Sequence, residues 1–293
     1  MLVIVRTALT LGQHSDSDIS TISASQIATY RPYTYFAGTG YCPANYTRAW
    51  SCAANCLANP DFNPVASGGN GFKLSVLYWF VGYSPSLKRV IVSLEGTRVT
   101  SILSMLTNTS ISRITLNPAL FPGISSDIGV HSGFADEHTK TATDILIAVK
   151  SALSTFGASR VTLVGHSLIR HLFNSISAAL SLLDSVYLPL HLPSPVVFNT
   201  IAYGFPRVGN QAFADYVDAN LSLTHINNQK DTVPVVPGKA IEYRHSAGEV
   251  HIQASEAWYS CPGQDNDSDL CIVGDVPNLF SDSIPNLWAH MMG

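Results

Sequence analysis

The stretch Val161-Thr-Leu-Val-Gly165-His166-Ser167-Leu168 decides the fold of this 293-residue chain. Its apolar run is typical of a buried strand, and Gly-x-Ser at the end of such a strand, before a helix, is the context of a nucleophile elbow. A small residue two positions before the serine permits the sharp turn, and the backbone N–H of Leu168 can then face an oxyanion. A chance Gly-His-Ser is the alternative, because the motif's second glycine is replaced by Ile169.

Strands and helices alternate on both sides of this stretch. This alternation predicts an α/β fold with a mostly parallel central sheet flanked by helices. Residues 13–40, rich in Ser, Thr and Tyr, are interpreted as an arm lying on the domain. The predicted strands are Phe72–Tyr83, Arg89–Leu94, Arg160–Gly165, Val196–Tyr203, Leu223–Asn227 and Ile241–Tyr243, with strand-like Gly248–Ile252, and the predicted helices span about 139–156, 168–188 and 209–220.

Charged residues are sparse, at 12% against the roughly 25% that is usual for soluble domains. Apolar residues make up 46% of the chain, which is enough for a large core and excludes global disorder. The net charge of −4 gives no electrostatic footprint for nucleic acid. No apolar run is long enough to span a membrane. A Gly-rich phosphate loop after a strand is also absent from the sequence, so a nucleotide-binding α/β protein is excluded.

Several features favour a secreted protein. Cys261 and Cys271 bracket a loop suited to a disulfide, Cys52 and Cys56 are four residues apart, and the odd total of five leaves at least one cysteine without a partner in the chain. Metal binding by either pair is disfavoured, because no second Cys or His cluster stands at ligand spacing. Asn-x-Ser/Thr sequons occur at Asn45, Asn108, Asn220 and Asn266. We interpret residues 1–24 as an N-terminal segment that is the remnant of a signal peptide, and 25–293 as a single domain.

Five ordered motifs over about residues 25–285 resemble the fungal class 3 lipases. They are Gly165–Leu168, Val90–Thr97, Val130–Ala135, Ala202–Asn210 and Asn227–Pro234. The combination of Pro-Arg-Val-Gly-Asn with a later Lys-Asp-x-Val-Pro is specific. The resemblance implies an α/β-hydrolase fold and a serine esterase that needs no metal or organic cofactor.

By this resemblance Ser167 is the nucleophile, and Asp231 is the acid that orients a catalytic histidine. The backbone N–H groups of Thr97 and Leu168 form the oxyanion hole, with the Thr97 hydroxyl as a further donor. Asp231 is placed in a loop at the sheet edge, after a strand ended by Val233 and Pro234; a turn-forming role is the alternative for this residue. Glu95 stands where the family more often has Arg or Gln.

The resemblance also places a lid at about Arg98–Ile114. Its inner face would be Ile102, Leu103, Met105 and Leu106, packed on the acyl site until a lipid surface displaces it. The alternative is that these Met and Leu side chains, at helical spacing, belong to the ordinary hydrophobic core.

Two departures from the family pattern bear on activity. Nine residues, Ile169–Ser177, stand where one glycine is expected, and eight extra residues in a helix would turn its buried face by about 80° past two full turns. We interpret the insert as an error of the gene model, such as retained intron sequence. Asn286 stands about where the family has its catalytic histidine, so His290 is proposed as the base. His245 and His251 are interpreted as surface or core-edge residues, and His131 and His166 as supporting ones.

These observations predict a secreted, monomeric hydrolase acting on a lipid or ester substrate at an oil–water interface, with triacylglycerols favoured. A feruloyl-type esterase and a catalytically impaired homologue that only binds lipid are the alternatives. Labelling of Ser167 by a fluorophosphonate would separate an active enzyme from the impaired homologue, because that reaction needs both the elbow and the base.

Overall fold

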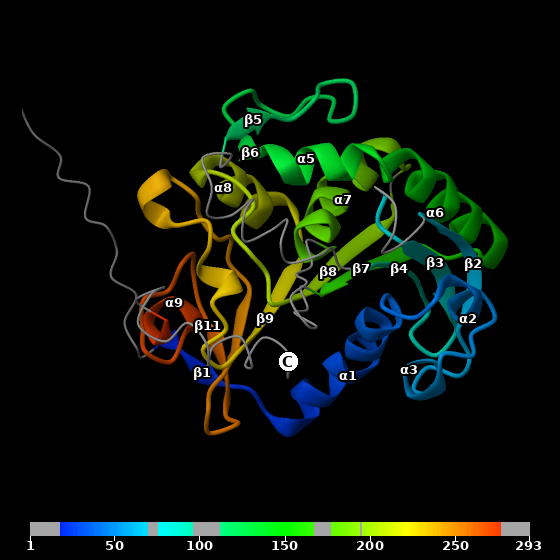
Figure 1. Cartoon of the computed structure of the whole chain (residues 1–293), viewed down its shortest axis with the longest axis horizontal. Helices are drawn as coiled ribbons and strands as arrows, with labels where there is room; N and C mark the ends of the chain where they lie inside the picture. Colours follow the sequence, from blue (N-terminus) through cyan, green and yellow to red (C-terminus); the bar gives the residue numbers. More distant parts are fainter. Residues whose placement is uncertain (1–17, 70–75, 96–111, 167–176, 194, 277–293) are drawn as a thin grey trace, which may run out of the picture.

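A mixed sheet whose five central strands are parallel forms the centre of the molecule (Figure 1). The computed structural model describes residues 18–69, 76–95, 112–166, 177–193 and 195–276. Within these ranges the sheet has nine strands in the order β1-β11-β10-β9-β8-β7-β4-β3-β2, with antiparallel pairs at both edges. The strands are β1 (Ser20–Thr21), β2 (Asn63–Gly68), β3 (Trp79–Ser84), β4 (Arg89–Leu94), β7 (Arg160–His166), β8 (Val197–Tyr203), β9 (Leu223–Asn228), β10 (Glu249–Ile252) and β11 (Trp258–Cys261).

Helices cover both faces of this sheet, and each covered face has its own apolar core. On one face α6 and α7 pack with Val92, Leu163 and Ala202, and on the other α1 packs with Phe80, Ile91 and Val164 (Figure 1). The helices are α1 (Ala24–Thr39), α2 (Ala44–Arg48), α3 (Ala53–Leu57), α5 (Ser132–Thr139), α6 (Ala142–Phe156), α7 (Ser177–His191), α8 (Gln211–Asn220) and α9 (Ile272–Asp275), with 3₁₀ turns at Val233–Val235 and Lys239–Ile241 and a separate hairpin of β5 (Arg113–Thr115) and β6 (Gly129–His131).

The predicted mostly parallel α/β sheet is confirmed. Strands β4, β7, β8, β9 and β10 lie within one or two residues of their predicted bounds. Both ends of α8 and the last residue of α6 agree equally well. These segments combine apolar runs with clear Gly, Asn or Ser boundaries, which is why sequence periodicity locates them. Asn210 caps α8, with its side chain accepting from the N–H of Phe213.

Residues 24–39 of the predicted arm do lie on the sheet, but as helix α1, which was not predicted and which begins at a capping box between Ser23 and Gln26. Other predictions about elements were wrong. Tyr243 belongs to no strand: the segment before it is the 3₁₀ turn Lys239–Ile241, and Glu242 has a left-handed backbone with φ 64°. The predicted strand Phe72–Tyr83 begins only at Trp79 within the described residues, and the predicted helix from 139 begins at Ala142.

Helix α7 keeps the sheet contacts that the insert puts at risk. It begins at Ser177, and every residue from there to Leu188 is buried, against β7 and β8 among others. Residues 167–176, which include most of the insert, lie outside the described residues. From Ser177, the last residue of the insert, α7 therefore packs on the sheet with the small-residue face that the family pattern predicts for it.

Two disulfides are present, and both join cysteines close in sequence. Cys52 is bonded to Cys56 and Cys261 to Cys271, while Cys42 is free. The loop closure predicted for Cys261 and Cys271 is confirmed.

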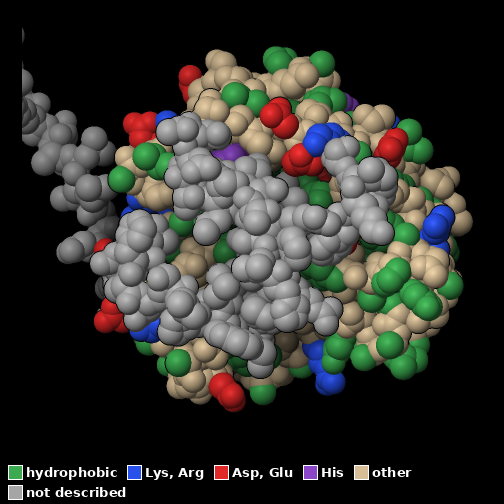
Figure 2. All heavy atoms as spheres, viewed as in Figure 1, with side chains coloured by type: hydrophobic (Ala, Val, Ile, Leu, Met, Phe, Trp, Pro, Cys, Tyr) green, Lys and Arg blue, Asp and Glu red, His purple; other side chains and the backbone are tan. Residues whose placement is uncertain are grey.

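The surface reflects the sparse charge of the sequence. Over the described part of the face in Figure 2, blue and red side chains occur singly or in small groups among tan and green ones. Within the described ranges, no helix combines the length and apolar character needed to cross a membrane.

Candidate active site

The carboxyl ends of the parallel strands bring the predicted site positions to one edge of the sheet. Leu94 of β4 pairs with Gly165 of β7, which pairs in turn with Ala202 of β8, so these strands end at the same level. Ser167 and Leu168 directly follow β7, and Thr97 follows β4 by three residues. This is the edge at which ligands bind in open parallel α/β sheets.

Ser167, Leu168, Thr97 and His290 themselves lie outside the described residues, as do Asn286 and the four proposed lid side chains. Of the predicted catalytic residues, Asp231 alone is among those described. Residues 113–114, at the end of the proposed lid stretch, belong to strand β5, which pairs with β6.

Asp231 lies in the loop after β9 and is 1% exposed. Its Oδ1 accepts a hydrogen bond from the backbone N–H of Val233 at 2.9 Å, and its own N–H donates to Asn228 O at 3.1 Å. The loop position matches the prediction, but β9 ends at Asn228, and Val233 and Pro234 belong to a 3₁₀ turn and do not end the strand. The carboxylate is thus held at the base of a short helical turn.

Arg207 and His245 hold the loop that follows Asp231. The Arg207 guanidinium donates to the carbonyls of Val235 and Pro237, and its backbone N–H donates to Val236 O at 3.0 Å. His245 Nε2 donates to Pro234 O at 2.6 Å. Four consecutive carbonyls are therefore bound, which fixes the backbone beside Asp231. Arg207 belongs to a matched motif, but its role here was not visible in the sequence.

Arg207 is itself buried and paired with Asp265. Its Nε and Nη2 each lie 2.7 Å from Asp265 Oδ1, and Asp265 Oδ2 accepts from the N–H of His245 at 3.0 Å. A planar guanidinium can serve a carboxylate and several carbonyls together, which an ammonium group does less well.

His245 and His251 are buried, so their interpretation as surface or core-edge residues was wrong. The His245 ring stacks on His225 at 4.9 Å between centroids. Burial lowers the pKa of His225 to about 4 and that of His245 to about 3. His251 lies in β10, with Nε2 3.4 Å from Asp275 Oδ2. These histidines are neutral structural groups at ordinary pH.

Glu249 lies beside this group and is also buried. Its Oε1 accepts from the N–H of Ile272 at 2.6 Å, and desolvation raises the pKa of its carboxyl to about 8. Its oxygens are close to the sulfurs of Cys261 and Cys271. Because these sulfurs are bonded to each other, they are not thiolate ligands for a metal ion.

His166 and Glu95 are buried at the edge of the sheet where β4 and β7 end. The His166 ring lies edge-on to Tyr41 and Tyr203, and the Tyr41 hydroxyl donates to His166 O at 2.8 Å. His131 caps α5, with Nδ1 accepting from Gly133 N. Both histidines therefore make structural contacts at this edge of the sheet. Desolvation raises the pKa of the Glu95 carboxyl to about 7, so near neutral pH this group is in part uncharged.

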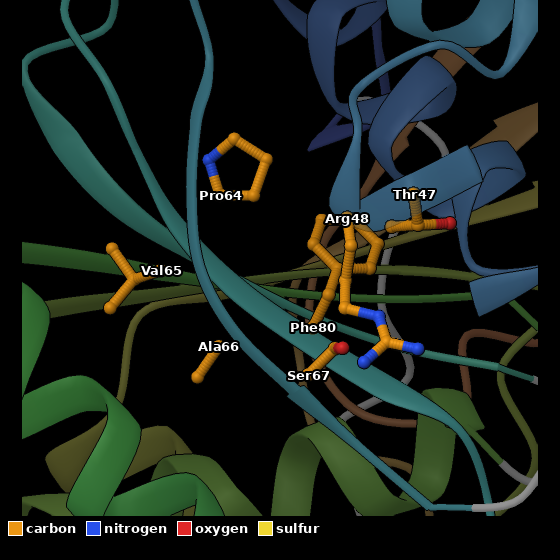
Figure 3. A pocket seen from close by; sticks show the side chains of 7 residues that line it. All are labelled: Thr47, Arg48, Pro64, Val65, Ala66, Ser67 and Phe80. Atoms are coloured by element: carbon orange, nitrogen blue, oxygen red, sulfur yellow. The ribbon is translucent and has the colours of Figure 1, made fainter. Parts of the chain in front are cut away.

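Two pockets lined by described residues lie away from Asp231. One, of about 220 Å³, lies between α2 and the edge strand β2, where Arg48 extends toward Ser67 and Phe80 (Figure 3). The other, of about 500 Å³, lies among α7, the start of β8 and the end of α8. Neither contains a predicted site residue.

Comparison with known proteins gives matches along most of the chain. The model of the family "Lipase (class 3)" matches residues 91–241. A secreted mono- and diacylglycerol lipase of Malassezia globosa is 32% identical over 73% of this chain and 72% of its own length. A secreted mono- and diacylglycerol lipase of Gibberella zeae is also 32% identical, over 76% of this chain and 71% of its own.

Solved structures match over nearly the whole chain. A lipase from Rhizopus microsporus var. chinensis has a TM-score of 0.74 at 24% identity, covering 97% of this chain and 92% of its own. The Lip2 lipase from Yarrowia lipolytica has a TM-score of 0.74 at 22% identity, covering 93% and 96%. At these identities the matches establish the fold, which is the α/β-hydrolase fold that the sequence predicted.

Proposed function

The chain belongs to the class 3 lipase family of serine ester hydrolases, and we propose that it is a secreted lipase that cleaves acylglycerols with Ser167 as nucleophile. The observation that carries this proposal is the buried, rigidly held Asp231 at the sheet edge where β4 and β7 also end. An acid at this edge can orient a histidine toward the residue that follows β7.

In the proposed mechanism His290, oriented by Asp231, takes the proton of Ser167 Oγ as this oxygen attacks the ester carbonyl. The N–H groups of Thr97 and Leu168 stabilise the oxyanion. Collapse of the intermediate breaks the bond to the alcohol, which leaves with the proton from His290. Water, deprotonated by the same histidine, then hydrolyses the acyl-enzyme and releases the fatty acid.

The relatives favour mono- and diacylglycerols as substrates over the triacylglycerols that the sequence suggested. Curated relatives that align over 60–76% of this chain are named secreted mono- and diacylglycerol lipases. The same names support secretion. We further propose that the protein is a monomer and that it acts on its substrate at an oil–water interface.

Purified protein and its Ser167→Ala variant test this function on monoolein, diolein, triolein and ethyl ferulate. We expect serine-dependent release of oleate, fastest from the first two. Equal, background rates for both proteins would refute the enzyme proposal, and serine-dependent cleavage of the ferulate ester alone would identify the esterase. His290→Asn tests the base, and activity equal to wild type would exclude His290 from the triad.

Asp231→Asn separates the catalytic role of this residue from its structural role. The amide oxygen can still accept from Val233 N, so we expect an unchanged unfolding midpoint. An amide cannot stabilise the imidazolium, so kcat should fall by roughly 10³–10⁴. Wild-type kcat in the folded variant would leave only the turn-forming role for Asp231.

A further inference from the structure

The first residue of α7 is bound directly to the last residue of β7. Ser177 Oγ accepts from the N–H of His166 at 3.1 Å and donates to His166 O at 2.7 Å. Both residues are buried, with Ser177 at 0% exposure. Two hydrogen bonds from one short side chain hold the start of the helix against the end of the strand, although ten residues separate the two along the chain.

The packing below these hydrogen bonds is that of an elbow. A Cβ on Gly165 would lie 2.5 Å from the carbonyl oxygen of Ser177 and 2.7 Å from Ala178 Cα. Such distances exclude any side chain at 165, because the first turn of α7 lies on the backbone of the strand. The close strand–helix approach that a nucleophile elbow requires is therefore made with Ser177, at the far end of the insert.

The two hydrogen bonds also fit a shorter connection. If residues 169–176 were absent, Ser167 and Leu168 alone would join His166 to Ser177. Ser177 would then stand three residues after His166, and a hydroxyl that donates to the carbonyl three residues before it is a common local hydrogen bond. Such a four-residue turn brings its end Cα atoms within about 7 Å of each other, as the contact between His166 and Ser177 requires.

We propose that Ser177 completes the nucleophile elbow in place of the motif's second glycine, and that residues 169–176 are an insertion which the elbow does not need. This inference rests on the proposed function in its assignment of Ser167. It makes Ser177 a positioning residue, which acts by fixing the peptide group that precedes the nucleophile. The Tyr41 hydroxyl donates to the same carbonyl at 2.8 Å.

The test compares wild type with a variant lacking residues 169–176 and with the variants Ser177→Ala and Ser181→Ala. Ser181 is the matched control: it is buried in the same helix, its Oγ lies 2.6 Å from the same Cβ position on Gly165, and among the described residues this hydroxyl has no hydrogen-bond partner. The readouts are the rate of fluorophosphonate labelling at Ser167, kcat and KM on p-nitrophenyl butyrate, and the midpoint of urea unfolding.

We expect the deletion variant to unfold cooperatively at an equal or higher urea concentration and to label at least as fast as wild type. Ser177→Ala should lower kcat and the labelling rate about tenfold or more with little change in KM, because small misplacements of a nucleophile are costly. Ser181→Ala should stay within about twofold of wild type, since it loses no hydrogen bond.

The inference is overturned if the deletion variant loses cooperative unfolding, or loses labelling that wild type retains. It is also overturned if Ser177→Ala and Ser181→Ala behave alike. A wild type that neither labels nor differs from Ser167→Ala would instead contradict the proposed function. In that case the deletion variant still tests the insert. Labelling of Ser167 that appears only when residues 169–176 are removed, or an unfolding midpoint that their removal does not lower, supports the inference that the elbow does not need these residues.

Discussion

A buried ion pair sets much of the geometry around Asp231. Its members are Arg207 and Asp265, whose side chains are 2% and 6% exposed. The guanidinium also binds the loop carbonyls that follow Asp231. Removing one partner of such a pair leaves the other charge buried and uncompensated, which is more costly than losing a surface pair.

Asp265→Asn should therefore lower the free energy of unfolding by about 3–5 kcal/mol. Glu242→Gln is the matched control, because Glu242 also pairs with an arginine, Arg113, at 2.5 Å but is 78% exposed. Its cost should be within about 1 kcal/mol. Urea unfolding of both variants measures the difference, and equal costs would contradict the structural role given to Arg207.

Burial also discriminates among the predicted glycosylation sequons. Asn266 is 2% exposed, its Nδ2 donates to Pro262 O at 3.0 Å and its Oδ1 accepts from Ser268 N. Asn45 and Asn220 are exposed. In protein secreted from a fungal host, we expect glycans on Asn45 or Asn220 and none on Asn266, as determined by peptide mass mapping after enzymatic deglycosylation. A glycan on Asn266 would show that the loop opens during maturation.

At the scale of elements, α1 shows how tertiary contacts create a helix from an unpromising segment. Its sequence is rich in Tyr and Thr and contains Pro32, so its apolar pattern is weak. Phe36 is nevertheless fully buried against Phe62, with centroids 4.9 Å apart, and against Trp50 at 5.9 Å. The packing of this aromatic group, more than helix propensity, stabilises α1.

Phe36→Ala should cost about 3–5 kcal/mol of unfolding free energy, because it leaves a cavity in this aromatic group. Ile147→Ala in α6 provides the contrast, since Ile147 is 62% exposed, and should change stability by no more than about 0.5 kcal/mol. Urea denaturation followed by tryptophan fluorescence distinguishes the two, and a small loss for Phe36→Ala would mean that α1 docks only weakly.

For the whole molecule, the buried ionisable groups make stability depend on pH from both sides. The pKa of Glu249 is raised in the folded state to about 8, so between about pH 4.5 and 8 the folded state keeps a proton that the unfolded state releases, and stability is lost as pH rises. The pKa values of His225 and His245 are lowered, so stability is lost as pH falls from about 6.5 toward 4.

Glu249→Gln should therefore remove the loss of stability that Glu249 causes between about pH 4.5 and 8, and keep the loss at acid pH that His225 and His245 cause. The amide oxygen can still accept from Ile272 N, while the cost of ionisation is removed. Urea unfolding at intervals from pH 5 to 9 measures this, and a variant that loses as much stability as wild type between pH 6.5 and 8 would exclude Glu249 as the cause.

Local patterns in the sequence were enough to predict the central strands, the helices α6 and α8, the fold family and the loop position of Asp231. Continuous apolar runs, helical periodicity and specific motifs carry that information along a few neighbouring residues. Ile241 and Tyr243 are strand-forming residues, but Ile241 ends a 3₁₀ turn and Glu242 between them has a left-handed backbone, so the same reasoning failed there.

The sequence by itself thus determined the protein family, and with it the class of reaction, and which residues stand at the ends of the central strands. Only the tertiary structure decided that Arg207 and His245 hold the Asp231 loop, that His245 and His251 are buried, and that α7 meets Gly165 through Ser177. The reason is physical: these roles depend on contacts between residues distant in sequence, whose energy comes from burial and close packing and leaves no periodic trace in the chain.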